Sequence, residues 1–63
     1  MMQFGIGELV YFHDLDGKVY LSVVLEEGVF GYGGDTRVIY VIYSIANQTT
    51  WIAYESELHA LNN

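Results

Sequence analysis

The stretch that most restricts the fold of this chain is 37–45, which reads RVIYVIYSI. Its β-branched and aromatic residues are typical of a β-strand. A strand that covers a core with one face normally alternates apolar and polar residues, because successive side chains point to opposite sides of the sheet. This stretch is apolar on both sides. We therefore predict that one face fills the interior of a small all-β domain and that the other meets a second copy of the chain.

The length and composition of the chain add a second limit. The 63 residues are interpreted as one domain, 1–63, near the smallest size that folds without a covalent or metal staple. Cysteine is absent, so neither a disulfide nor a thiolate metal site can stabilise the fold. Only 16% of the residues are charged, against about 25% in a typical soluble domain. Because so few charges are available to cover the surface, we expect contact with another subunit to add to stability.

The charge balance excludes some classes of partner. Eight carboxylates stand against Lys18 and Arg37, which gives a net charge of −6. Such a surface repels phosphate, so nucleic acid is not an expected partner. No apolar run reaches the ~18 residues of a membrane span, and the start Met1-Met2-Gln3 lacks the charged front of a signal peptide. We expect no membrane association and a cytoplasmic location.

Glycine and small polar residues divide the chain into strand-like runs, since proline is absent. Asp16-Gly17 is typical of a tight hairpin turn, because glycine tolerates the positive φ that such turns require. The glycine-rich segment 28–35, GVFGYGGD, is predicted to be a flexible hairpin loop. A 3₁₀ turn is expected at 55–58, with Leu58 closing one end of the fold. The predicted strands are 8–13, 18–27, 36–44, 50–54 and 58–61, and we expect them to close into a small barrel.

Several short motifs follow one another in an order that is informative. Gly7-Glu8-Leu9-Val10 opens the first predicted strand, and Gly17-Lys18-Val19 opens the second. Tyr40-Val41-Ile42-Tyr43 lies in the third, Trp51 in the fourth, and Glu57-Leu58 before the last. In this order the chain resembles small SH3-like barrel proteins of bacteria and their phages. The resemblance implies a five-stranded SH3-like barrel with a 3₁₀ turn before the last strand, acting as a binding or assembly module in a bacterial cell or phage-infected host.

The sequence leaves open which face of the third strand points inward. Arg37 favours the outside, and Ile39, Val41 and Tyr43 would then lie outside with it. The family pattern instead places Val41 and Tyr43 inside. The outer row and its neighbours on the second strand would then be Val38, Tyr40, Ile42, Tyr20 and Val24. We hypothesise that this second arrangement holds and that the row is buried between copies of the chain.

No combination of residues predicts a catalytic, cofactor or metal site. The segment 14–17, DLDG, has two carboxylates before a glycine but lacks the further oxygen ligands of a calcium loop. The glycines of 28–35 precede a strand, whereas a phosphate loop requires a helix there. His13 and His59 lack a chelating spacing, although pairing of the first and last strands would bring them together.

Self-association is therefore the leading functional hypothesis, with the chain as a non-enzymatic assembly module. The alternative is a monomeric adaptor that docks a peptide or host protein on outer aromatic residues. An RNA-binding ring of the Sm-like type conflicts with the charge of −6. An enzyme would need an acid, a base and a nucleophile that converge, and none is evident. The residues predicted to contact a partner are Tyr20, Val24, Val38, Tyr40, Ile42, Trp51 and Tyr54.

Overall fold

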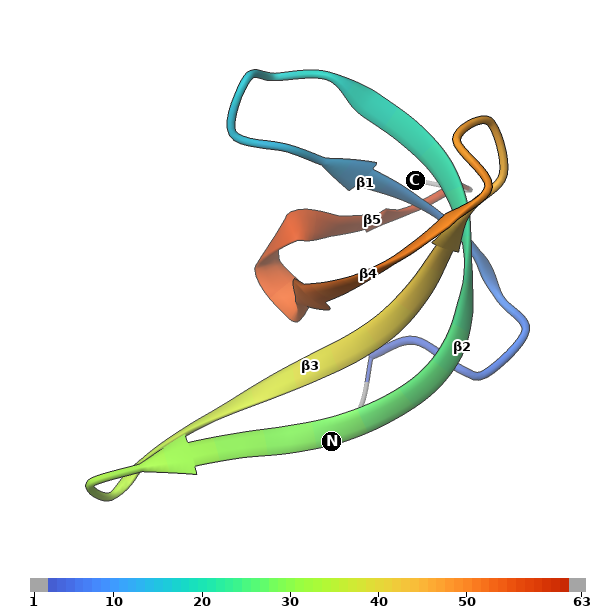
Figure 1. Ribbon diagram of the computed structural model, residues 1–63. Coiled ribbons are helices and arrows are strands. Elements are labelled where there is room, and N and C mark those ends of the chain that lie inside the picture. Colours follow the sequence, from blue (N-terminus) through green and yellow to red (C-terminus); the bar gives the residue numbers. More distant parts are fainter. Residues whose placement is uncertain (1–2, 62–63) are drawn as a thin grey trace.

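The computed structural model describes residues 3–61 as one antiparallel sheet of five strands (Figure 1). The strands lie in the sheet in the order β4-β3-β2-β1-β5. This arrangement confirms the all-β prediction and the short 3₁₀ turn before the last strand. The elements are β1 (Leu9–His13), β2 (Val19–Tyr32), β3 (Asp35–Ser44), β4 (Thr49–Tyr54), the 3₁₀ turn η1 (Glu55–Glu57) and β5 (Leu58–Ala60).

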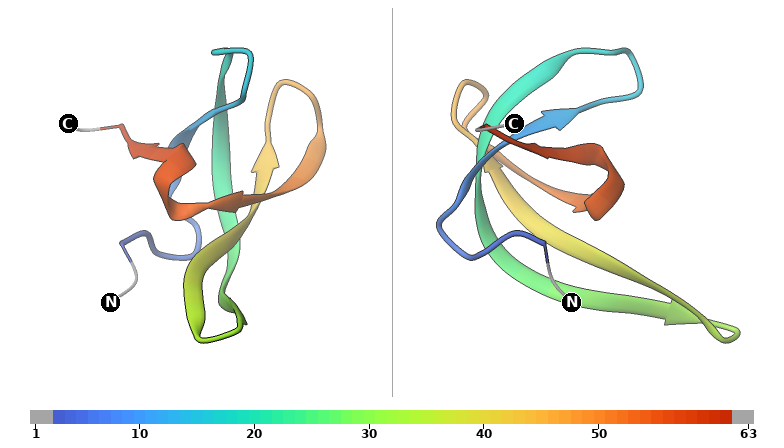
Figure 2. Two further views of the ribbon diagram at one scale, coloured as in Figure 1. Left: turned by 90° about the vertical axis from the view of Figure 1, so that its left-hand side faces the viewer. Right: turned by 180° about the vertical axis from the view of Figure 1, so that it is seen from behind.

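The length and bend of β2 give the sheet its shape. The first part of β2 pairs with β1, while the longer second part pairs with β3. The register changes between Val24, which faces Ile42, and Glu26, which faces Val41, so Leu25 is an extra residue on β2. Such a β-bulge bends a strand and increases its twist. Figures 1 and 2 show β2 arching so that the sheet curls back on itself.

The turn between β1 and β2 is held by one aspartate. Asp14 Oδ1 accepts hydrogen bonds of 2.9 Å from the backbone N–H groups of Asp16 and Lys18. Gly17 has a φ of 83°, as the predicted turn requires. The hairpin predicted at Asp16-Gly17 is therefore confirmed.

The segment 28–35 does form a hairpin, as predicted, but the prediction that the whole segment is a flexible loop is wrong. Strands β2 and β3 continue to the pair Tyr32 and Asp35, so only two residues form the turn. These are Gly33 and Gly34, with φ angles of 61° and 88°. A two-residue hairpin turn of this kind requires positive φ at both central positions, which two glycines supply without strain. The result is a two-stranded arm that extends away from the curled part of the sheet (Figure 1).

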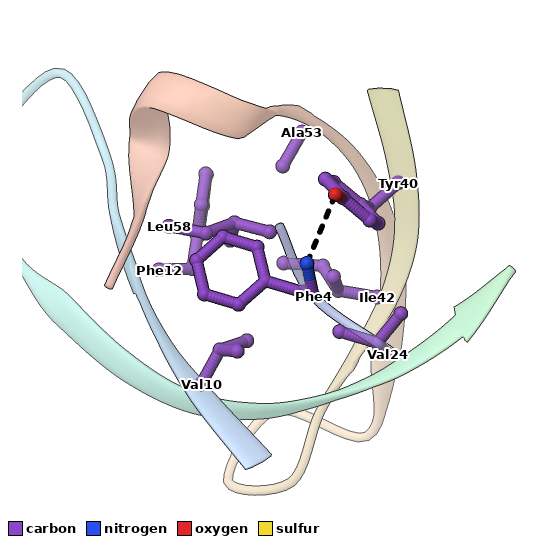
Figure 3. Close-up of a cluster of buried hydrophobic side chains, with 8 residues drawn as sticks. All are labelled: Phe4, Val10, Phe12, Val24, Tyr40, Ile42, Ala53 and Leu58. Carbon is purple, nitrogen blue, oxygen red and sulfur yellow. Dashed lines mark hydrogen bonds between the residues drawn. The ribbon is translucent and has the colours of Figure 1, made fainter. Parts of the chain in front are cut away.

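The core lies on the concave side of the curled sheet (Figure 3). Strand β3 sends its even-numbered side chains inward, and Leu58 fills the core from the start of β5, as predicted. The centroids of the Phe12 ring on β1 and the Trp51 ring on β4 lie 6.4 Å apart in a stacked arrangement, so the end strand β4 contacts β1 across the curl through side chains. The buried apolar residues are Phe4, Val10, Phe12, Val24, Tyr40, Ile42, Ala53 and Leu58.

This core contradicts the predicted facing of β3. Val24, Tyr40 and Ile42 are 0% exposed and cannot form an outer row. Tyr20 and Val38 are partly buried and pack against the same core. Successive side chains of a strand point to opposite faces of the sheet, so when the even-numbered residues of β3 are buried the odd-numbered ones must point outward. The row that contains Arg37 is therefore the outer one, and the row hypothesised to lie between copies fills the interior.

The hydroxyl of Tyr40 is bound by three hydrogen bonds inside the fold. It donates to Glu55 Oε2 at 2.7 Å and accepts from the backbone N–H groups of Phe4 at 3.2 Å and Gln3 at 3.1 Å. Glu55 Oε2 also accepts from Gln3 N–H at 3.0 Å. Burial raises the pKa of Tyr40, so the phenol stays protonated and able to donate. This cluster fastens the segment before β1 over the core, with Phe4 edge-on to the Tyr40 ring at 5.6 Å.

We expect Tyr40→Phe to lower the free energy of unfolding by about 1–3 kcal/mol, because the buried N–H of Phe4 loses its acceptor. Urea denaturation measures this change. Tyr43→Phe is the matched control, since its side chain lies on the outer row, and we expect a change within about 0.5 kcal/mol. Equal effects of the two substitutions would contradict the role assigned to the Tyr40 hydroxyl.

Glu55 makes the stability of the fold depend on pH. The hydrogen bond from Tyr40 lowers the pKa of Glu55 below its ordinary value of 4.5. A carboxyl group with a lowered folded-state pKa stabilises the fold above its unfolded pKa, and this stabilisation is lost as the pH falls through the folded pKa. We expect wild-type protein to be more stable than Glu55→Gln at pH 6 to 7, and the difference to shrink below about pH 4.5. Thermal unfolding of both proteins across this range tests the prediction, and a difference that does not depend on pH would refute it.

Candidate interaction surface

The convex side of the sheet carries an apolar surface over β2, β3 and β4. The outer row of β3 is Ile39, Val41 and Tyr43, continuing from Arg37. On β4, Tyr54 lies opposite Ile39 and Ile52 lies opposite Val41. Directly opposed residues of an antiparallel pair share a face, so these side chains form one surface. We call it the outer β3 face, and its members are Phe30, Ile39, Val41, Tyr43, Ile52 and Tyr54.

The outer β3 face has a hollow, and Gly28 lies opposite Ile39, one of the residues that line it. Gly28 contributes no side chain, and a Cβ there would lie 4.0 Å from Ile39 Cγ1. The hollow is lined by Phe30, Ile39, Ile52 and Tyr54, which are all apolar or aromatic. Ile52 is 71% exposed. Because full burial of an isoleucine stabilises by about 1.5–3 kcal/mol, covering this side chain would recover much of that amount.

Polar groups border the hollow on the side of the arm. The Arg37 guanidinium lies 5.4 Å from the centroid of the Tyr54 ring, and its Nε is 3.8 Å from Asp35 Oδ2. Both charged side chains are well exposed, so their ion pair contributes little to stability. The cation over the ring instead fixes the orientation of Tyr54 at the rim of the hollow.

Beyond Asp35 and Arg37 at the start of β3, the hairpin formed by β3 and β4 carries no charged residue. Residues 38–54 contain no Asp, Glu, Lys or Arg, although the chain carries ten such residues in total. Glu26 borders the outer β3 face, because it lies opposite Val41 on β2. The rest of that face is therefore neutral in a chain with a net charge of −6.

Of the seven predicted partner residues, Trp51 and Tyr54 are the two well exposed at the surface. Each is 41% exposed. Tyr54 belongs to the outer β3 face, whereas Trp51 points to the concave side and stacks on Phe12. The sequence prediction omitted Phe30 and Ile52. Alternation outward from Arg37 would have identified the face, but the pairing that places Ile52 beside Val41 is visible only in the folded sheet.

The two histidines do come together, as pairing of the first and last strands predicted. Strands β1 and β5 are antiparallel neighbours, and the rings of His13 and His59 lie 4.2 Å apart. In residues 3–61, no group of three or more His, Asp or Glu side chains is placed to hold a metal ion.

No protein-family model matches this chain, and no curated protein or solved structure matches it either. Within the part of the chain that the structure describes, no helix is long and apolar enough to cross a membrane.

The hollow makes Gly28 a position that tolerates a side chain, in contrast to the turn glycines. We expect Gly28→Ala to leave the free energy of unfolding unchanged or slightly raised, because its φ is not positive and the added Cβ meets only Ile39 at 4.0 Å. Gly34→Ala is the matched comparison, and its φ of 88° should cost about 1–2 kcal/mol. Urea denaturation of both variants tests the hairpin geometry. A larger loss at Gly28 than at Gly34 would contradict it.

Proposed function

We propose that this chain is a non-enzymatic interaction module that assembles with further copies of itself through the outer β3 face. We further propose that its curled sheet is a small SH3-like barrel, of the kind found in bacteria and their phages. The observation that carries the proposal is the apolar outer row of β3, Ile39, Val41 and Tyr43, flanked by Ile52 and Tyr54 from β4. Association would remove these side chains from water, which is the main favourable term in most protein contacts.

The distribution of charge supports a second copy as the partner. Two molecules that each carry −6 repel one another wherever their carboxylates approach. The β3–β4 hairpin carries no carboxylate across residues 38–54, so two copies that meet over β3 and β4 reduce that penalty, with Glu26 on β2 at the border of the contact. A nucleic acid would meet the same repulsion without offering an apolar surface to match the face.

The alternative function is a monomeric adaptor, and the hollow beside Gly28 favours it. A single apolar side chain of a peptide would fit against Phe30, Ile39 and Ile52, with Tyr54 held at the rim by Arg37. Aromatic anchors in small pockets often dominate such contacts. The mass of the protein in solution separates the two proposals.

Light scattering coupled to gel filtration over a range of concentrations tests self-association. We expect the wild-type chain to exceed the mass of a monomer, and Val41→Lys to lower that mass while the β-type circular dichroism is retained. The new Lys would lie opposite Glu26 at the wet surface of the monomer, whereas the contact between copies would strip both charges of water.

Val29→Lys is the matched control for this substitution. Val29 is an exposed valine of the same β2–β3 hairpin, but it shares the face of Val38 on the opposite side. We expect its mass to equal that of the wild type. A wild-type chain that is monomeric at every concentration would overturn the self-association proposal and leave the adaptor as the candidate.

A further inference from the structure

The outer edge of β4 has unpaired backbone groups. Strand β4 pairs with β3 on one side, and it is an end strand of the sheet among residues 3–61. The N–H of Tyr54 donates to Glu57 Oε1 at 2.8 Å, so this N–H points away from β3. Backbone groups of successive residues in an antiparallel strand point to alternate sides. The N–H and C=O groups of Thr50 and Ile52 therefore also point to the free edge.

Apart from the Glu57 carboxylate at its Tyr54 end, this edge lacks the features that usually prevent strands from pairing between molecules. Charged residues, proline and bulges are the common means of protection. The six residues of β4, TTWIAY, contain neither charge nor proline, and their register with β3 is unbroken. All except Ala53 are exposed. The other end strand, β5, is half as long and begins directly after Glu57.

One register of an antiparallel β4–β4 pair uses all of these groups. Thr50 of one copy then lies opposite Ile52 of the other, and each of these pairs exchanges two backbone hydrogen bonds. Trp51 lies opposite Trp51 of the second copy, at a position where side chains approach closely. The ring of Trp51 is already held by stacking on Phe12, at 6.4 Å, yet it is 41% exposed. A second indole ring would cover part of that exposed surface.

We infer that β4 pairs antiparallel with β4 of a second copy about a two-fold axis at Trp51, which joins the two sheets edge to edge. The inference rests on the proposed self-association and adds a second contact to it. Residues 38–54 carry no carboxylate, and the Glu57 carboxylate lies at the Tyr54 end of the edge, so the Thr50–Ile52 pairs can form with less repulsion than the rest of the chain would cause. The two outer β3 faces then become neighbouring parts of one wider apolar surface.

Hydrogen exchange on the wild-type chain tests the edge contact directly. We expect the amides of Thr50 and Ile52 to exchange ~tenfold or more slowly at a concentration where the assembly dominates than at one where the monomer dominates. The amides of Trp51 and Ala53 are the internal control, because they are bonded to β3 in every state. Exchange of Thr50 and Ile52 that does not change with concentration in an associating protein would overturn the inference.

Cysteine cross-linking gives a second, independent measurement, because the chain has no native cysteine. In the proposed register two Trp51 Cα atoms lie within disulfide range, whereas two Ile52 Cα atoms do not. We expect Trp51→Cys to form a disulfide-linked dimer under mild oxidation and Ile52→Cys to form severalfold less. Equal cross-linking at both positions would contradict the register. If Trp51→Cys fails to fold, as circular dichroism would show, hydrogen exchange on the wild type decides.

The edge contact and the proposed function fail in different ways. If Val41→Lys lowers the mass but Thr50 and Ile52 remain unprotected, the outer β3 face is correct and the edge contact is wrong. If the edge is protected and Val41→Lys has no effect on mass, the edge contact stands and the face does not. A monomer at every concentration overturns both.

Discussion

The structure depends most on the buried hydroxyl group of Tyr40. This residue sits at the centre of β3, where its ring fills the core and its polar end still requires a partner. Glu55 supplies an acceptor from the turn after β4, and the backbone of Gln3 and Phe4 supplies donors. One side chain thereby ties the chain start, the middle strand and the last turn together. A fold of this size has few other long-range polar contacts to share that task.

The orientation of Tyr40 also decides what the molecule shows to its surroundings. Because Tyr40 and Ile42 point inward, Ile39 and Val41 must point outward. The bulge at Leu25 bends β2 around the core, and β4 then places Ile52 beside Val41. The apolar outer β3 face is thus a direct consequence of filling the core with the other row. A strand has both rows covered only when other layers pack on both faces of its sheet, whereas this single curled sheet covers its concave side alone.

Much of the fold could be predicted from the sequence because the turn residues and the strand-forming residues indicated the same elements. Asp16-Gly17 specified a turn, runs of β-branched and aromatic residues between glycines specified strands, and the 3₁₀ turn before Leu58 lies where it was expected. The loop at 28–35 was mispredicted because glycine was read as flexibility. Gly33 and Gly34 instead adopt the positive φ angles that a tight turn requires. Local composition cannot separate these two uses of glycine, since the difference lies in whether the flanking strands pair.

The sequence by itself determined that this chain forms strands, that β3 is apolar on both sides, and that the charge is strongly negative. Only the tertiary structure decided which row is buried, because each row of 38–43 carries one valine, one isoleucine and one tyrosine. Long-range hydrogen bonds favour the observed arrangement, above all those that join the Tyr40 hydroxyl to Phe4, Gln3 and Glu55. These residues lie 36, 37 and 15 positions away in the sequence. Such contacts have no local signature, so the face and the edge on which a partner would dock became identifiable only in the folded sheet.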